Sequence, residues 1–300
     1  MAGHFEVERA EIARRIKAAG NTFSEETIAT FAPLFAKFHA RRDEAAREPV
    51  KIQRDLAYGP HRERNLLDVH VTAGGGSAKP IVIFFHGGGL VRGNKDGGGP
   101  YYGNIASFFA RHGAVGINAT YRLAPEIQWP EGARDVGAVA AWAREHAAEF
   151  GGDPDKIVLT GHSAGATHVA SYVFRPDLHP GGKRNFAAAI LMSGVYGIDM
   201  DNPPPNHRAY YGTDRARYPG MQVTGNAACF DFPMLFTVAE YDPLRFESGL
   251  YRLLAELVDK GAPNPRIRQF LGHNHISPAL TIGTGEEDVE NPLLDFLKTI

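Results

Sequence analysis

One serine of this sequence stands in a setting that could make it reactive. Ser163 is the centre of the pentapeptide GHSAG at residues 161–165, with an apolar run before it at 156–160 and a helical pattern after it. A tight turn from strand to helix exposes such a hydroxyl at the carboxyl edge of a sheet, and small residues on either side allow the turn. The pattern predicts a nucleophile, and a glycine-lined packing turn is the alternative interpretation.

A glycine-rich turn upstream could supply the second requirement of this chemistry. The sequence HGGG at 86–89 follows another short apolar run, at 81–85. A serine that attacks a carbonyl creates an oxyanion, which needs hydrogen-bond donors aimed at it in advance. We therefore expect backbone N–H groups of these glycines to serve as oxyanion donors. A flexible glycine turn remains an alternative, whereas a phosphate loop is disfavoured because no Gly-Lys-Ser/Thr follows the glycines at 87–99.

These two motifs and a third, YRLAPE at residues 121–126, together resemble the hormone-sensitive-lipase-like branch of the α/β-hydrolase fold. The resemblance covers residues 68–297. It implies a carboxylesterase-type serine hydrolase whose catalytic residues follow the order Ser, Asp, His along the chain. It also implies an oxyanion hole formed by the backbone amides of Gly88, Gly89 and Ala164.

The same resemblance implies the other two catalytic residues. The apolar run 234–239 leads into a turn that contains Asp242-Pro-Leu, which matches the family's acid turn, although Asp242 could instead cap the next helix. The run 266–271 ends in a loop with two histidines, His273 and His275. In the related enzymes the base stands three positions after the glycine that ends the strand, which implies His275.

The histidine loop, Gly-His-Asn-His-Ile-Ser from residue 272, also resembles that of feruloyl-esterase-like and arylformamidase-like hydrolases. The function expected is hydrolysis of small esters with short acyl or aryl groups, through an acyl-enzyme. An arylformamidase or amidase with the same triad is one alternative. A non-catalytic ligand receptor is another, and it would be expected to have lost a member of the triad.

The elements that must position these residues alternate along the chain. Short apolar runs suit strands buried on both faces of a parallel sheet, and the stretches between them have helical periodicity. The sequence therefore predicts a doubly wound α/β-hydrolase with a mostly parallel twisted sheet flanked by helices, preceded by antiparallel edge strands at 50–58 and 64–71. The apolar runs are 81–85, 114–119, 156–160, 187–192, 234–239 and 266–271, and the helical stretches are 102–112, 136–150, 164–174 and 246–260.

Two segments do not belong to this alternation. Residues 1–48 have an amphipathic helical pattern and are expected to form a cap ahead of a catalytic domain at 49–300, with Ser24 as a helix N-cap and Pro33 dividing the second helix. Residues 198–232 are rich in proline, glycine and aromatics and too long for an ordinary connection, so they are either an exposed excursion or a lid or pocket wall.

Several side chains are candidates for the wall of a substrate pocket, although apolar surface beneath a cap would give the same pattern. They are Leu90, Asp96, Tyr101, Trp129, Tyr210 and Tyr211.

Composition limits the partners of the protein. The chain has 300 residues, a formal net charge of -2 and one cysteine, Cys229. The near-neutral balance argues against nucleic acid and membrane surfaces, and the single cysteine favours a cytoplasmic location. His273 and His275 lack the companion ligands of a zinc site. We expect a small-molecule ester as substrate and no cofactor or metal, and a homodimer stays open.

Overall fold

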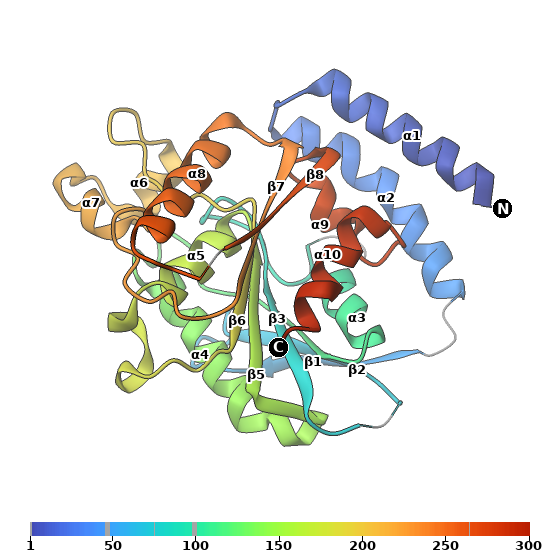
Figure 1. Ribbon diagram of the computed structural model, residues 1–300, viewed down its shortest axis with the longest axis horizontal. Coiled ribbons are helices and arrows are strands. Elements are labelled where there is room, and N and C mark those ends of the chain that lie inside the picture. The colour runs from blue at the N-terminus through green and yellow to red at the C-terminus, as the bar shows by residue number, and fades with distance from the viewer. Residues whose placement is uncertain (1, 46–48, 75, 98–100, 264) are drawn as a thin grey trace.

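A computed structural model describes residues 2–45, 49–74, 76–97, 101–263 and 265–300. Its eight strands form one sheet in the order β1-β2-β4-β3-β5-β6-β7-β8 (Figure 1). The strands β1 and β2 are antiparallel additions at one edge, and all other pairings are parallel. The strands are β1 (Val50–Ala57), β2 (Leu66–Thr72), β3 (Lys79–Phe85), β4 (Val115–Ala119), β5 (Gly152–His162), β6 (Ala188–Met192), β7 (Met234–Tyr241) and β8 (Arg266–Asn274).

Helices cover both faces of the sheet, as the alternating sequence pattern predicts. One face carries α4 (Glu131–His146), α5 (Ala164–Val173) and α8 (Leu244–Asp259), and the other carries α3 (Gly103–Arg111) and α10 (Glu287–Leu297) (Figure 1). Successive side chains of β3 alternate between the two cores: Ile83 and Phe85 pack in the first, and Val82 and Phe84 in the second. Both faces are apolar, which explains the continuous apolar runs and confirms the predicted fold class.

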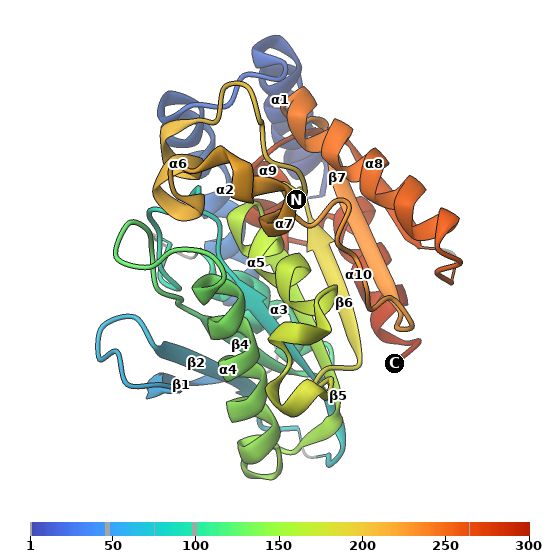
Figure 2. The same cartoon turned by 90° about the vertical axis from the view of Figure 1, so that its left-hand side faces the viewer.

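The N-terminal helices α1 (Ala2–Ala19) and α2 (Glu25–Ala45) lie at one end of the sheet (Figure 2). Ser24 caps α2, because its Oγ accepts a hydrogen bond from the N–H of Thr27 at 3.2 Å. The predicted break at Pro33 is wrong, since α2 runs through it. Burial of Phe31 and Phe35 on either side of the proline holds the helix together. The predicted end of the cap at 46–48, and the last glycines of the 87–99 stretch, lie outside the described residues.

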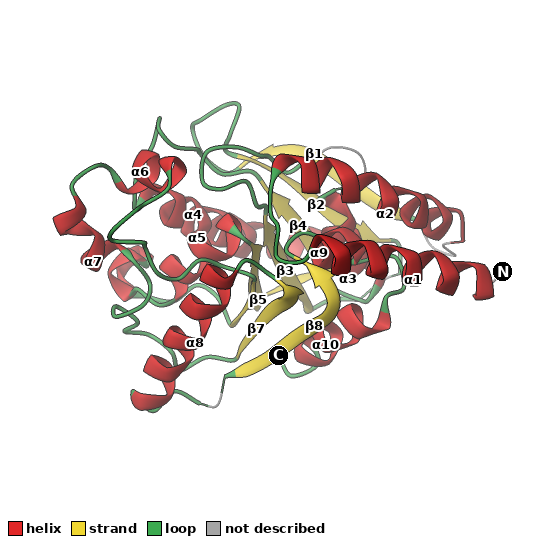
Figure 3. Cartoon of the chain, turned by 90° about the horizontal axis from the view of Figure 1, so that it is seen from above, coloured by secondary structure: helices red, strands yellow, loops and turns green. Residues whose placement is uncertain are grey.

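Residues 198–232 contain two short helices, α6 (Pro205–Tyr211) and α7 (Tyr218–Met221). Seen from above, these helices lie on one side and α1 and α2 on the other, with loops between them (Figure 3). The small helix α9 (Ser277–Thr281) follows β8 and packs against α2. In the part of the chain that the structure describes, no helix has both the length and the apolar character needed to cross a bilayer.

Candidate active site

Ser163 occupies the turn between β5 and α5, with a backbone φ of 55° and ψ of -120°. This left-handed conformation is unusual for a residue with a side chain. Its N–H donates to the carbonyl of Met192 on β6 at 2.9 Å, which holds the turn against the sheet. A Cβ on Gly165 would lie 2.1 Å from the carbonyl oxygen of Phe85, so only glycine allows α5 to approach β3 this closely.

Ser163, His275 and Asp242 form a continuous hydrogen-bonded chain at the carboxyl edge of the sheet. The Ser163 Oγ lies 2.9 Å from His275 Nε2, and His275 Nδ1 lies 2.6 Å from Asp242 Oδ1. Asp242 is fully buried, and His275 and Ser163 are 2% and 8% exposed. The three residues come from the ends of β5, β7 and β8, and the structure brings them together in the order that the resemblance implies.

The second oxygen of Asp242 also has partners. Its Oδ2 accepts hydrogen bonds from Ser193 Oγ at 2.6 Å and from the N–H of Ala239 at 2.8 Å. Burial alone raises the pKa of this carboxyl, but the adjacent His275 and these two donors outweigh it and lower the pKa of Asp242. The carboxylate is therefore held ionised beside the imidazole. It does not cap α8, whose N-cap position is Pro243.

Three rings pack around the imidazole of His275. Phe23 approaches it edge-on with ring centroids 4.5 Å apart, and Phe246 lies 4.4 Å away on another side. His162 contacts it at 4.9 Å and donates from Nε2 to the carbonyl oxygen of His275 at 2.7 Å. Burial, reinforced by the neighbouring His275, lowers the pKa of His162 to about 3. His162 is therefore a neutral ring that fixes the backbone of the histidine loop.

The HGGG turn faces the same cavity as Ser163, and the backbone N–H groups of Gly88 and Gly89 donate to no other described residue. The N–H of Ala164 belongs to the first turn of α5, where no intrahelical acceptor exists. These are the three amides that the resemblance implies for an oxyanion hole. The turn needs glycine at position 88, where φ is 135° and a Cβ would lie 2.0 Å from the carbonyl oxygen of Arg92.

The YRLAPE motif anchors both ends of this turn. Tyr121 donates its hydroxyl to the carbonyl of His86 at 2.8 Å, and its ring stacks on that of His86 at 4.1 Å. At the other end, the N–H of Ala124 donates to the carbonyl of Leu90 at 3.0 Å. The motif therefore fixes the loop that carries Gly88 and Gly89.

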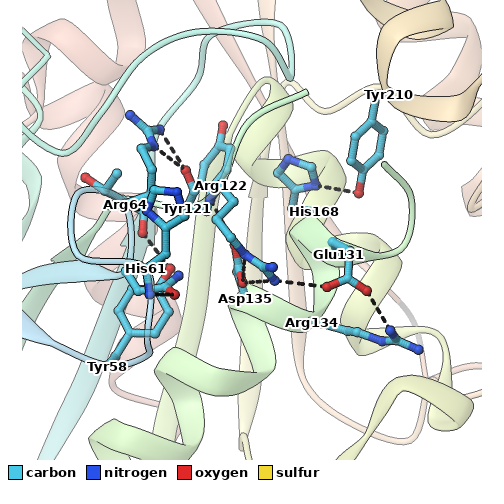
Figure 4. Close-up of polar contacts among 12 residues, drawn as sticks. Tyr58, His61, Arg64, Tyr121, Arg122, Glu131, Arg134, Asp135, His168 and Tyr210 are labelled. Carbon is cyan, nitrogen blue, oxygen red and sulfur yellow. Dashed lines mark hydrogen bonds and ion pairs between the residues drawn. The ribbon is translucent and has the colours of Figure 1, made fainter. Parts of the chain in front are cut away.

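Arg122 of the motif points toward Asp135 and Glu131 (Figure 4), and neither Arg122 nor Glu126 lines the cavity of Ser163. Arg122 contacts α4, where its guanidinium pairs with Asp135 at 2.7 Å and Glu131 at 3.0 Å. Arg64 donates to the carbonyl of Tyr121 at 2.7 and 3.0 Å. Together these contacts give the motif a positioning role, which accounts for charged residues so close to a buried site.

Ser163 and His275 lie in a cavity of about 730 Å³. Apolar side chains form much of its wall, and Leu90 is among them, as expected from the sequence. Most of the remaining lining residues come from the cap, the HGGG turn and the loop after it, the excursion, α8, and the segments at or after the ends of β5, β6 and β8. They include Phe23, Ser24, Glu25, Ile28, Val91, Arg92, Val195, Pro205, Asn206, His207, Arg245, Phe246 and Ile276.

The other predicted wall residues are placed elsewhere. Tyr210 and Tyr211 are buried in a cluster with Leu90 and Ala164. Trp129 packs partly buried against that cluster. Tyr210, Tyr211 and Tyr218 thus form the core of the excursion together with Ile198 and Met221. The residues of this segment that do reach the cavity come from positions 205–209.

Asp96, Tyr101 and His273 are also separate from the cavity that holds Ser163. Asp96 and Tyr101 line a polar cavity of about 260 Å³, in which Asp96 pairs with Lys95 at 3.3 Å. His273 faces a third cavity beneath α1, and its Nδ1 lies 2.9 Å from Ser277 Oγ. Of the two histidines in the loop, the structure brings His275 to the serine.

The sequence predicted that the N-terminal helices cover the pocket, but it singled out no residue of the loop between them. Asn21 donates from its side chain to the carbonyl of Asp242, and Phe23 contacts His275. The sequence feature that could have indicated this contact is the apolar Phe23 directly before the N-cap Ser24. Among the described residues, no group of three or more His, Cys, Asp or Glu side chains could hold a metal ion.

Comparisons with known proteins agree with this architecture. The BD-FAE family model matches residues 67–173. Carboxylesterase NlhH of Mycobacterium tuberculosis is 30% identical over 237 residues, which cover 69% of this chain and 70% of NlhH. Esterase LipQ of the same organism is 29% identical over 240 residues, which cover 74% of this chain. The match spans 56% of the length of LipQ.

Solved structures show the same fold at lower identity. An esterase of Pyrobaculum calidifontis is 22% identical, with a TM-score of 0.66 and coverage of 91% of this chain and 93% of its own. A structure titled bacterial heroin esterase is 21% identical, with a TM-score of 0.68 and coverage of 96% and 95%. With NlhH matched across most of its length and the sheet shared with these esterases, the chain belongs to the hormone-sensitive-lipase-like carboxylesterases of the α/β-hydrolase fold.

Proposed function

We propose that this chain hydrolyses small carboxylic esters through an acyl-enzyme on Ser163. The observation that carries the proposal is the hydrogen-bonded chain from Ser163 through His275 to Asp242 at the floor of an apolar cavity. His275 removes the hydroxyl proton as Ser163 attacks the ester carbonyl, and it then gives the proton to the departing alcohol. Water, deprotonated by the same imidazole, releases the acid.

The amides of Gly88, Gly89 and Ala164 are proposed to hold the oxyanion of each tetrahedral intermediate. They face the cavity of Ser163, and those of the two glycines have no competing acceptor among the described residues. Donors already aimed at the developing charge need no reorganisation during the reaction, and loss of one such donor lowers turnover about 100- to 1,000-fold in other serine hydrolases.

We assign a preference for short acyl or aryl esters, because two segments confine the cavity. Phe23 and Ile28 of the N-terminal cap form part of its wall, and Pro205 and His207 of the excursion form another part. This supports the division into a cap at 1–48 and a catalytic domain at 49–300. An arylformamidase would use the same residues, so substrates must separate the two activities.

The experiment that tests this function is a panel of nitrophenyl esters of increasing acyl length, assayed beside an aryl formamide and a feruloyl ester. We expect the highest kcat/KM with short acyl esters, and a smaller value for the formamide. Ile28→Ala should shift the optimum toward longer chains, whereas Val7→Ala, an exposed position on α1, should not. A wild-type protein that cleaves only the formamide would contradict the esterase assignment.

We expect kcat/KM to fall as the pH is lowered from neutrality, and to level off above it. The base must be neutral to accept a proton, and histidine side chains titrate near ~6.5 in peptides. Burial lowers the pKa of His86 and His168 to about 3, as it does for His162, so these rings stay neutral and do not contribute. The lowered pKa of Asp242 keeps its carboxylate ionised in mild acid.

The measurement is a pH–rate profile with a short aryl ester, with circular dichroism at each pH to confirm that the protein is folded. A profile that stays flat from acid to neutral pH in the folded protein would rule out a histidine base.

A further inference from the structure

Arg245, at the start of α8, faces the cavity of Ser163 without an acidic partner in the described chain. The charged residues lining this cavity are Glu25, Arg92 and Arg245. Arg92 is hydrogen-bonded to Glu25, so those two charges offset each other. Arg245 is exposed, and its guanidinium lies over the ring of Phe246 at 5.2 Å. The described lining therefore carries one uncompensated positive charge.

The environment of Arg245 leaves its charge available to a ligand. Asp199 accepts hydrogen bonds on Oδ1 from the N–H groups of Asp201 and Asn202 within its own turn, and among the described residues no ion pair joins it to Arg245. Arg245 also contributes to the lowered pKa of His207, to about 4, after burial, which is the larger cause. The guanidinium thus acts on the wall formed by α6 as well as on Phe246.

The position of Arg245 relative to His275 indicates which half of an ester it would meet. In the proposed reaction the imidazole gives its proton to the departing alcohol, so the alcohol lies on the His275 side of the cavity. The ring of Phe246 is 4.4 Å from that of His275, and the guanidinium of Arg245 lies 5.2 Å from the same Phe246 ring. An aromatic alcohol packed beside Phe246 would point its far end toward the guanidinium.

We propose that the preferred substrates are short-acyl esters of aromatic alcohols that carry an anionic group, such as a carboxylate, which Arg245 binds. This inference rests on the proposed esterase function and names its substrate class. The ester bond to the aromatic oxygen breaks, water supplies the hydroxyl of the released acid, and the phenol regains a proton through His275. A guanidinium suits a carboxylate because its paired N–H donors match the two oxygens.

The test compares 4-acetoxybenzoate with 4-acetoxybenzamide, which differ in the charge of the group that would reach Arg245. We expect the ratio of kcat/KM, anionic over neutral, to fall about 2- to 5-fold in Arg245→Gln, which corresponds to an ion pair near a protein surface. In Arg245→Lys the ratio should lie between those of the wild type and Arg245→Gln. Raising the salt to about 0.15 M and beyond should lower the wild-type ratio, because salt screens exposed charges.

Arg252→Gln is the matched control, because Arg252 is also exposed on α8 but does not line the cavity. Its ratio should equal that of the wild type. An unchanged ratio in Arg245→Gln, or an equal fall in Arg252→Gln, would overturn the proposal while esterase activity on the benzamide stands. If the wild type cleaves neither ester, the proposed function fails instead. In that case the role of Arg245 is tested by calorimetry, which measures the affinity of 4-hydroxybenzoate for Ser163→Ala and for the double variant Ser163→Ala/Arg245→Gln. Equal affinities of the two variants would refute the role of Arg245.

Discussion

Ser163→Ala is expected to lower turnover of a short aryl ester by about a million-fold. Removal of the nucleophile stops acyl transfer, and the remaining members of a serine–histidine–aspartate set contribute little without it, as in a well-studied serine protease. The hydroxyl is 2.9 Å from His275, and the alanine side chain lacks only this oxygen. Circular dichroism and thermal unfolding of the purified variant should therefore show a folded protein.

The measurement is steady-state kinetics together with labelling by a fluorophosphonate, which reacts with activated serines. Wild-type protein should carry the label on Ser163 alone, and Ser163→Ala should carry none. Ser171→Ala is a suitable control, because Ser171 is a buried serine on α5, the helix that follows Ser163, and it does not line the cavity. Activity above a few per cent in Ser163→Ala, with contamination excluded, would disprove the nucleophile.

Replacement of His275 by alanine should have an effect of similar size, whereas His273→Ala should keep a substantial share of the activity. The two histidines stand two positions apart but face different cavities. His275 Nε2 lies 2.9 Å from Ser163 Oγ, within the range required of a general base, and His273 is hydrogen-bonded to Ser277 instead.

Turnover of both variants should be compared at neutral pH, with circular dichroism to confirm folding. Added imidazole should restore part of the activity of His275→Ala, because it can enter the space left by the ring, and it should not stimulate His273→Ala. An active His275→Ala beside an inactive His273→Ala would reverse the assignment of the base.

The strands and the main helices could be predicted because their sequences satisfy local requirements. Residues 81–85 are continuously apolar because both faces of β3 are covered, and this pattern is visible without the structure. The small residues at 161–165 predict the tight turn at this position. The short helices α6, α7 and α9 were not identified, since segments of four to seven residues show little periodicity. The helix α10, which has 11 residues and contains Pro292, was not identified either.

The walls of the site depend on contacts between distant parts of the chain, which no local pattern encodes. Asn21 and Asp242 are 221 positions apart, yet the cap loop touches the acid's backbone. Tyr210 and Trp129 are aromatic residues of the kind found in binding pockets. In the structure, Tyr210 is buried in a packed cluster and Trp129 packs against that cluster. Motifs in the sequence were thus enough to predict which reacting residues meet at one edge of the sheet. The residues that surround them and select a substrate could be identified only from the folded structure.

The backbone at Ser163 has a consequence for how such a protein evolves. Its φ of 55° is a conformation in which a residue with a side chain is strained, typically by about 1–3 kcal/mol, whereas glycine adopts it freely. A gene copy released from catalysis would therefore gain stability by drifting from serine to glycine at this position. Under the proposed mechanism, the serine at this position keeps a reactive hydroxyl at a cost in backbone stability, and a descendant that had become a receptor would be free to lose it.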